Sequence, residues 1–506
     1  MKAGHKQELA SNELIYKSIG IDTYHENTIY MREDCHICRS EGFTALTRVE
    51  VAVNGKSIVA TLNVVYSNLL SHNEAGLSKQ AIEQLGAKEG DAIKISHLKP
   101  IESLGRVRAK MYGKELDQQS YNAIIADIVA GKYSNIELSA FVSACADDKL
   151  TVNEITSLTL AMINSGETMK WGKEMVLDKH CAGGLPGNRT TPIVVSIVAA
   201  AGLTIPKTSS KSITSPAGTA DTMEVMTRVD LSMEEMKKVV EQENGCLIWG
   251  GSVRLSPADD ILISVEKALD VDSEGQMIAS VLSKKAAAGS THVLIDIPVG
   301  KTAKVRTHEE ALRQQYYFKA VGEAIGLNVS VLFTDGSQPV GKGIGPALEA
   351  MNLLSVLRNE KDCPKDLKTR SLDLAGELLA ISGKFKIGEE RKIAQEILES
   401  GKALQKFMSI CKAQGGFAEP RFAKYCFDVV SEKKGTVKEI DNRKLARIAK
   451  LAGAPKAPRA GVWYNAPLNS SVSKGDILFS IYAEANGELE YAKDYYKSIT
   501  GLILIE

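Results

Sequence analysis

The sequence has no excess of charge of either sign and few aromatic residues. Its 62 Lys and Arg residues balance 62 Asp and Glu residues, and aromatic residues make up 6% of the 506 positions. A protein that grips a nucleic-acid backbone usually needs a basic face, and single strands also need aromatic platforms for stacking. The composition therefore disfavours nucleic acid as the main partner.

Long apolar runs are also missing. The most apolar stretch, residues 193–203, is much shorter than the roughly 18 residues of a membrane-spanning helix. We interpret it as a buried helix and expect no membrane partner. The N-terminal segment has neither a continuous apolar core nor a cleavage pattern, so a cytoplasmic location is predicted. The 8 cysteines are mostly scattered, as expected for reduced thiols.

Changes in residue pattern divide the chain into four predicted domains. Residues 1–95 contain short β-type runs and the hairpin dipeptide Asn54-Gly55, which predict a small N-terminal β-barrel. Residues 96–172 have apolar residues at three- and four-residue steps and predict a helical domain. Within it, Asn135 and Thr151 are expected N-caps, and Thr151 with Glu154 fits a capping box.

Strand-like and helix-like segments alternate over residues 173–432, with strands expected at 175–177, 292–297 and 329–333. This alternation is typical of a mostly parallel α/β sheet, which binds ligands at the carboxyl ends of its strands. Residues 433–506 predict a small C-terminal α+β domain with turns at Gly475, Gly487 and Gly501. The predicted fold class is thus multidomain α/β.

The densest chemical motif is Asp178-Lys-His-Cys-Ala-Gly-Gly-Leu-Pro-Gly-Asn-Arg-Thr-Thr191, between a predicted strand and a predicted helix. Its glycines let backbone N–H groups approach an anion, and the helix N-terminus favours negative charge. Lys179 supplies a positive charge, and the two threonines supply hydroxyls. The spacing is not that of a P-loop. A glycine-rich turn without a ligand is the alternative.

A second loop, residues 207–221, has six Ser and Thr hydroxyls between Thr208 and Ser215 and ends in Ala217-Gly-Thr219-Ala-Asp221. Hydroxyls and amides suit a sugar or phosphate ligand. The alternative is a solvated Ser/Thr loop. Two such loops, each after a predicted strand, strengthen each other as evidence for a ligand site.

Both loops, together with Ala279-Ser-Val-Leu-Ser-Lys-Lys285, resemble the thymidine and pyrimidine nucleoside phosphorylases over about residues 100–506. The N-terminal β domain and the motifs at 188–191 and 214–219 are similar to a longer branch. That branch includes archaeal AMP phosphorylases and bacterial chains regarded as thymidine phosphorylases. The resemblance implies a site in a cleft between the helical and α/β domains, closure of that cleft, and a homodimer or larger homo-oligomer.

Carried over residue by residue, the resemblance implies a phosphate site made of Lys179, Cys181, Thr191, Ser209 and Thr219. Cys181 stands where thymidine phosphorylases usually have a serine, so a weaker donor replaces a hydroxyl.

On the base side, the resemblance implies His180, Ser280 and Lys284, with His180 and Lys284 also catalytic candidates. His180 could instead only orient its loop. Val265 occupies the slot of an arginine that reads the base in thymidine phosphorylases, so a charge-assisted donor is missing.

The AMP-type pattern implies Asp272 as proton donor to the base, and a carboxyl donor needs a raised pKa. From the residues alone, Asp272 could equally cap a helix. The same pattern implies nucleotide contacts from Gly184, Ser210, Lys211, Ser212, Ile213, Thr214, Ser215, Thr219, Ser280 and Lys304.

We therefore predict a pentosyltransferase that converts thymidine and phosphate reversibly into thymine and 2-deoxyribose 1-phosphate. The first alternative is a nucleoside 5′-monophosphate phosphorylase that acts on AMP, CMP or UMP and forms ribose 1,5-bisphosphate. The second is a non-catalytic nucleotide-binding protein. A phosphoribosyltransferase such as the anthranilate enzyme is disfavoured, because the motif loops lack an acidic pair to hold magnesium.

No cofactor is expected, and inorganic phosphate is a co-substrate. Cys35-His-Ile-Cys38 has zinc-like spacing, but no second Cys/His pair lies nearby in the sequence, so no metal site is predicted.

Overall fold

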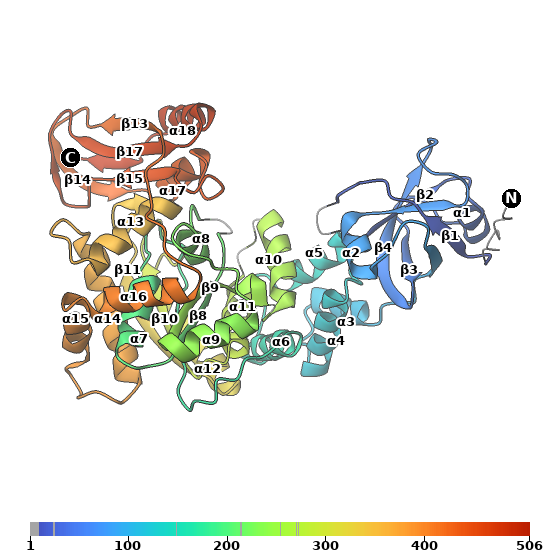
Figure 1. The fold of residues 1–506 in the computed structure, drawn as a ribbon, viewed down its shortest axis with the longest axis horizontal. Helices are drawn as coiled ribbons and strands as arrows, with labels where there is room; N and C mark the ends of the chain where they lie inside the picture. The colour runs from blue at the N-terminus through green and yellow to red at the C-terminus, as the bar shows by residue number, and fades with distance from the viewer. Residues whose placement is uncertain are drawn as a thin grey trace. The chain divides into compact units, whose positions relative to one another are not determined.

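The computed structural model describes residues 10–23, 26–147, 149–212, 215–253, 255–269, 271 and 273–506. The chain divides into two compact units, residues 1–144 and residues 145–506 (Figure 1). Within the described part of the chain, no helix combines the length and apolar character that crossing a membrane requires.

The first unit begins with a closed six-stranded barrel in the order β1-β5-β2-β4-β3-β6, as the sequence predicts. Asn54 and Gly55 form the expected hairpin turn, because both have positive φ and Val53 pairs with Lys56. Two short helices, α1 (His36–Glu41) and α2 (Lys79–Leu85), connect barrel strands. The strands are β1 (Glu13–Tyr16), β2 (Thr28–Arg32), β3 (Arg48–Val53), β4 (Lys56–Val65), β5 (Glu74–Leu77) and β6 (Ala92–His97).

Helices follow the barrel, and two of them begin near the predicted N-caps Asn135 and Thr151. The first unit contains α3 (Ser103–Met111), α4 (Gln118–Val129) and α5 (Asn135–Ala144), and the second unit begins with α6 (Val152–Asn164). Thr151 caps α6 in a capping box with Glu154, as predicted. The prediction for Asn135 is wrong by one residue. Asn135 is already helical, and Ser134 and Glu137 instead exchange backbone-to-side-chain hydrogen bonds.

The α/β part of the second unit contains, among the described residues, five strands that pair in parallel. They form a three-stranded sheet, β11-β10-β7, and a two-stranded sheet, β8-β9. The predicted strand at 175–177 is misplaced, because β7 runs from Leu177 to Cys181. Lys179, His180 and Cys181 therefore lie in a strand and pair with β10. The other strands are β8 (Ile205–Ser209), β9 (Gly245–Trp249), β10 (His292–Val299) and β11 (Asn328–Asp335).

Helices cover these sheets and supply most of the apolar core. Most of the apolar stretch at 193–203 lies in the buried α7 (Thr191–Ala200), which packs against α14 (Lys365–Ile381) and α16 (Lys402–Ala413). The remaining helices are α8 (Thr219–Glu224), α9 (Met233–Glu243), the 3-10 helix η1 (Gly250–Val253), α10 (Pro257–Leu269), α11 (Glu274–Ala287), α12 (His308–Ala324), α13 (Pro346–Leu357), α14 (Lys365–Ile381), α15 (Glu390–Glu399) and α16 (Lys402–Ala413).

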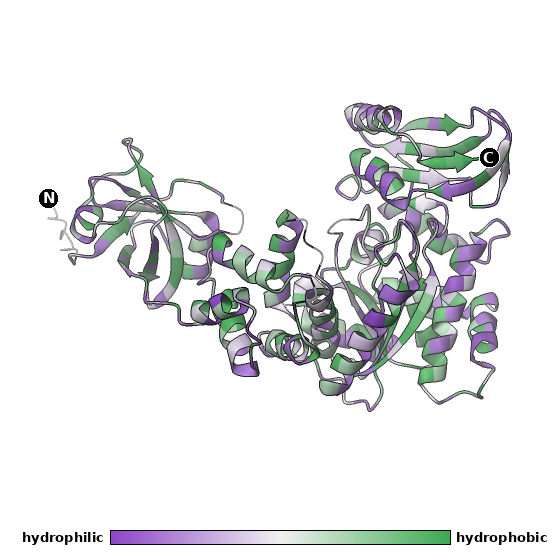
Figure 2. Ribbon diagram, turned by 180° about the vertical axis from the view of Figure 1, so that it is seen from behind, coloured by the Kyte–Doolittle hydropathy of each residue, from purple (hydrophilic) through white to green (hydrophobic). Residues whose placement is uncertain are grey.

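The C-terminal part has its own core between two antiparallel sheets and two helices, and Figure 2 shows its larger sheet mostly in green. Gly475 and Gly501 have positive φ and lie outside helices and strands, as predicted, but the turn at Gly487 is wrong because that residue lies in α18. The elements are β12 (Gly343–Ile344), β13 (Tyr425–Val430), β14 (Gly435–Ile440), α17 (Asn442–Leu451), β15 (Gly461–Tyr464), β16 (Ser471–Val472), β17 (Ile477–Ala483), α18 (Asn486–Ser498) and β18 (Ile503–Ile505).

The capping box of α6 makes a first prediction. Thr151→Ala removes the hydroxyl that accepts from the backbone N–H of Glu154, so the free energy of unfolding should fall by about 1 kcal/mol. Thr151→Ser keeps the hydroxyl and serves as the control. Urea unfolding measures both, and an alanine variant as stable as the serine variant would contradict the prediction.

Candidate active site

The first predicted turn follows β7 and leads into α7. Lys179 is fully buried in the middle of β7 (Leu177–Cys181) rather than free in the loop. Its Nζ donates to the Thr190 hydroxyl at 2.9 Å and lies 3.4 Å from an Asp296 carboxylate oxygen on β10. The ammonium thus joins the strand, the start of α7 and the neighbouring strand β10.

Glycine is required in this turn by close packing. Gly187 has φ +80°, and a Cβ atom there would lie 2.2 Å from the carbonyl oxygen of Val340. The backbone N–H of Val340 in turn donates to the carbonyl oxygen of Pro186 at 3.1 Å. Because Lys342 nearby accepts a backbone hydrogen bond from Tyr464, the C-terminal sheet is joined to the segment that supports the turn.

The second predicted loop connects β8 to α8, and Asp221 organises it. One Asp221 oxygen accepts from the backbone N–H groups of Ser212 and Gly218, at 2.6 and 2.7 Å. Lys211 pairs with Glu224 at 2.8 Å and lies 5.0 Å above the centre of the Trp249 ring.

The remaining hydroxyls of this loop make local contacts. Ser209 donates to the carbonyl of Ile248, Ser212 to the carbonyl of Ser215, and Ser215 to the carbonyl of Ala217. At Ser210 the backbone carbonyl accepts from the backbone N–H of Ala220. Ile213 and Thr214 lie outside the described residues.

Arg189 connects the two loops. Its guanidinium donates to the Glu349 carboxylate at 2.6 Å, to the Thr219 hydroxyl at 2.9 Å and to the Ala217 carbonyl at 2.8 Å. Burial raises the pKa of Glu349, although Arg189 opposes that shift. Arg189 therefore joins the first turn to Thr219 and Ala217 of the second loop, a contact that the motif alone did not predict.

A second buried ion cluster lies beneath the first turn. The Asp178 carboxylate on β7 pairs with Lys207 of β8 at 3.1 Å and with Lys285 of α11 at 2.8 Å. Burial lowers the pKa of Lys207 to about 7, while Asp178 acts in the opposite direction. The cluster fixes β7, β8 and α11 around one carboxylate.

His180 and Cys181 are both neutral near pH 7. Burial lowers the pKa of His180 well below its usual value, and four lysines, Lys285 foremost, add to that shift. Burial raises the pKa of the Cys181 thiol to about 12. Cys181 Sγ also accepts from the Asn188 amide at 3.2 Å, so the side chain at the expected serine position remains a thiol held inside the turn.

Two of the predicted base-side residues, Ser280 and Lys284, lie together on α11. The Lys284 ammonium donates to the Ser280 hydroxyl at 3.0 Å and to the carboxylate of Asp259 on α10 at 2.7 Å. Asp259 is 2% exposed, and its other oxygen has no hydrogen-bond partner among the described residues. Val265 is buried on α10, so no cation occupies that slot.

Three predicted site residues remain, namely Asp272, Lys304 and Gly184. Asp272 lies outside the described residues, but Ser273 is the N-cap of α11, its hydroxyl accepting from Gln276. Lys304 is exposed in the segment after β10, and Gly184 is exposed in the first turn.

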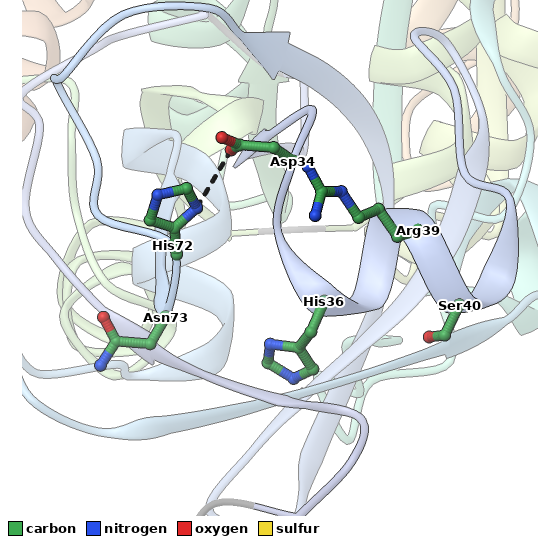
Figure 3. Close-up of a pocket in the computed structure, with 6 residues that line it drawn as sticks. All are labelled: Asp34, His36, Arg39, Ser40, His72 and Asn73. Carbon is green, nitrogen blue, oxygen red and sulfur yellow. Dashed lines mark ion pairs between the residues drawn. The ribbon is translucent and has the colours of Figure 1, made fainter.

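A separate surface hollow of about 560 Å³ lies on the N-terminal barrel. Figure 3 shows His72 beside Asp34 in this hollow. The His72 ring nitrogen lies 3.3 Å from the Asp34 carboxylate. Cys35 and Cys38 are buried nearby, and the Cys35 sulfur accepts from the Cys38 backbone N–H. This hollow shares no residue with the predicted site. It is lined by Asp34, His36, Arg39, Ser40, His72 and Asn73.

Comparison with known families and structures matches the chain in three parts. Residues 107–166 match the helical bundle domain of a glycosyl transferase family, and residues 173–404 match the a/b domain of that family. Residues 436–501 match the pyrimidine nucleoside phosphorylase C-terminal domain. A solved anthranilate phosphoribosyltransferase from Thermus thermophilus shares the fold, with a TM-score of 0.52 and 17% identity, over 61% of this chain and 98% of that one.

Two curated relatives match almost the entire chain. A protein of Hahella chejuensis is 54% identical over 99% of both chains, and one of Legionella pneumophila strain Paris is 55% identical over 98% of this chain and 96% of its own. Both carry the name "Putative thymidine phosphorylase".

The neutral state of His180 makes a prediction about acid stability. Below about pH 6.5 the unfolded chain protonates this imidazole and the folded chain resists protonation, so the free energy of unfolding should fall as the pH drops toward about 5. His180→Gln should lose less stability over that range. Urea unfolding from about pH 8 to pH 5 tests this, with His36→Gln on the barrel as the control. Equal acid losses in wild type and His180→Gln would contradict it.

Proposed function

The chain belongs to the glycosyl transferase family that combines helical bundle and a/b domains, here with a pyrimidine nucleoside phosphorylase C-terminal domain, and we propose that it catalyses reversible phosphorolysis of a pyrimidine nucleoside. The observation that carries the proposal is the pair of turns at the carboxyl ends of β7 and β8. Arg189 joins these turns, and their glycines, hydroxyls and buried cations suit a phosphate.

The proposed reaction exchanges one bond at the sugar. A phosphate oxygen forms a bond to the anomeric carbon, and the bond from that carbon to the base nitrogen breaks. The base leaves with the electron pair and takes up one proton, for which Asp272 is the proposed donor. With thymidine the products are thymine and 2-deoxyribose 1-phosphate. A phosphate dianion held by the two turns would stabilise the positive charge that develops on the sugar.

We assign the phosphate to Lys179, Cys181, Thr191, Ser209 and Thr219. In the structure the Lys179 ammonium already contacts Thr190 and lies farther from Asp296. Phosphate binding would replace the longer Asp296 contact. The neutral Cys181 thiol suits this place, because a thiolate would repel the dianion.

We assign Ser280 and Lys284 to the base, where the ammonium would stabilise negative charge on the departing ring. His180 would lie beside the base as a neutral imidazole that donates one hydrogen bond. Lys285, adjacent to Lys284 on α11, contacts β7 through Asp178, which supports a base position near His180. Asp272 remains the proposed proton donor.

A second candidate substrate is a nucleoside 5′-monophosphate, which would give the free base and ribose 1,5-bisphosphate. Two observations favour it. The base-reading arginine is replaced by the buried Val265, and the second loop presents the partly exposed cation of Lys211 beside Trp249. This cation, with the contacts proposed for residues 210–215 and Lys304, would receive the 5′-phosphate.

Further features of the proposal follow from the family resemblance. The partners are a small nucleoside or nucleotide and inorganic phosphate, without nucleic acid, membrane or cofactor. A homodimer or larger homo-oligomer and a cytoplasmic location remain predictions.

Base release with and without inorganic phosphate tests the proposed function. We expect phosphate-dependent release from thymidine or uridine, measured by chromatography, with AMP, CMP and UMP in the same panel. Release from the monophosphates alone would select the second candidate. Absence of phosphate-dependent release from every compound would contradict both and favour a nucleotide-binding protein.

Lys179 provides a sharper test, because its removal has two separable effects. Lys179→Met should lower turnover by about 100-fold or more, as expected for loss of a charged group at a transition state. It should also destabilise the fold by about 3–5 kcal/mol, because Asp296 is left buried without its cation.

The double variant Lys179→Met/Asp296→Asn separates these effects. It should recover most of the lost stability, measured by urea unfolding, while its turnover stays low. Full turnover in a folded variant without Lys179 would contradict its assignment to the phosphate.

A further inference from the structure

The Thr219 hydroxyl accepts a hydrogen bond, but its own proton is not donated to a protein group in the part of the chain that the structure describes. It accepts the Arg189 N–H at 2.9 Å, while no hydrogen-bond acceptor for its own proton is found among the described residues. The side chain is half-buried at the start of α8. A hydroxyl has one proton to donate, and an N–H that occupies its oxygen directs that proton elsewhere.

We propose that Arg189 is a positioning residue that orients the Thr219 hydroxyl so that it donates a hydrogen bond to the phosphate. This inference rests on the proposed function and adds a residue that the family resemblance did not assign to the site. A charged donor on the hydroxyl oxygen also polarises the O–H bond, which strengthens the hydrogen bond that it donates.

The first turn repeats the same arrangement with a different cation. Lys179 donates to the Thr190 hydroxyl at 2.9 Å, and both side chains are fully buried. In each turn a buried cation therefore donates to a threonine oxygen at the start of a helix. Because the arrangement occurs twice, we interpret a threonine hydroxyl oriented by a cation as a general feature of the site.

The surroundings of Arg189 hold the guanidinium in one orientation. Arg189 has 11% of its side chain exposed and Glu349 has 1%. Glu349 also accepts from the Gly345 backbone at 3.1 Å and the Thr222 hydroxyl at 3.4 Å, so it is itself fixed. The three Arg189 donors point at Glu349, Thr219 and Ala217, a fork that a lysine cannot reproduce.

A double-mutant cycle tests whether Arg189 acts through Thr219. The variants are Arg189→Met, Thr219→Val and the two together, measured as KM for phosphate and kcat in base release. Each single change should raise KM for phosphate by about 10- to 100-fold, the range for a hydrogen bond to a charged group. The double variant should be within about threefold of the worse single variant.

Two further variants separate positioning from general stability. Arg189→Lys keeps the charge but not the fork, so KM should stay raised. Arg228→Met removes an exposed arginine of comparable size, paired with Glu235, and should leave KM unchanged. If Arg189→Met does not fold, Arg189→Lys replaces it in the cycle.

The outcomes distinguish this inference from the proposed function. Independent effects of Arg189 and Thr219, which multiply in the double variant, would overturn the inference, as would an unchanged KM in Arg189→Lys. Absence of phosphate-dependent base release by the wild type would overturn the proposed function instead. The same double-mutant cycle would then be measured as dissociation constants for inorganic phosphate, by calorimetric titration. Unaltered phosphate affinity in the single variants would overturn the inference.

Discussion

The geometry of the candidate site depends on charged side chains that are almost completely removed from water. Asp178 holds Lys207 and Lys285, while Asp296 lies beside Lys179 and accepts from Thr334. Burying a charge is costly, and removing one partner from a buried pair costs more than the pair contributes. These contacts therefore specify where β7, β8, β10 and α11 meet, and the same residues supply the positive potential that an anion needs.

Further contacts fix the positions of the two turns. Gly187 allows the first turn to pack against the backbone at Val340, which continues into the strand paired with the C-terminal sheet. Arg189 then joins the first turn to the second through Thr219 and Ala217. An anion bound by one turn would thus meet donors from the other without a large rearrangement, which is the pre-organisation that transition-state stabilisation requires.

Local patterns predicted much of the fold and less of the site. The hairpin at Asn54-Gly55 and the capping box at Thr151 follow from short-range chemistry and are confirmed. The boundary of β7 was wrong because three charged or polar residues in succession suggest a loop, and their buried partners on β8, β10 and α11 are distant in sequence. The Asp259 contact to Lys284 and the Arg189 contact to Glu349 escaped prediction for the same reason. A ligand role for Ser209 stays a prediction, and Asp272 lies outside the described residues.

The proposed site requires both turns to bind the same phosphate. A crystal structure of the protein with arsenate in place of phosphate, located by its anomalous signal, would show which groups hold the anion. We expect one anion in contact with the first turn, between Lys179 and Thr191, and with the Thr219 hydroxyl of the second. Arsenate bound at one turn without the other, or only outside both, would contradict it.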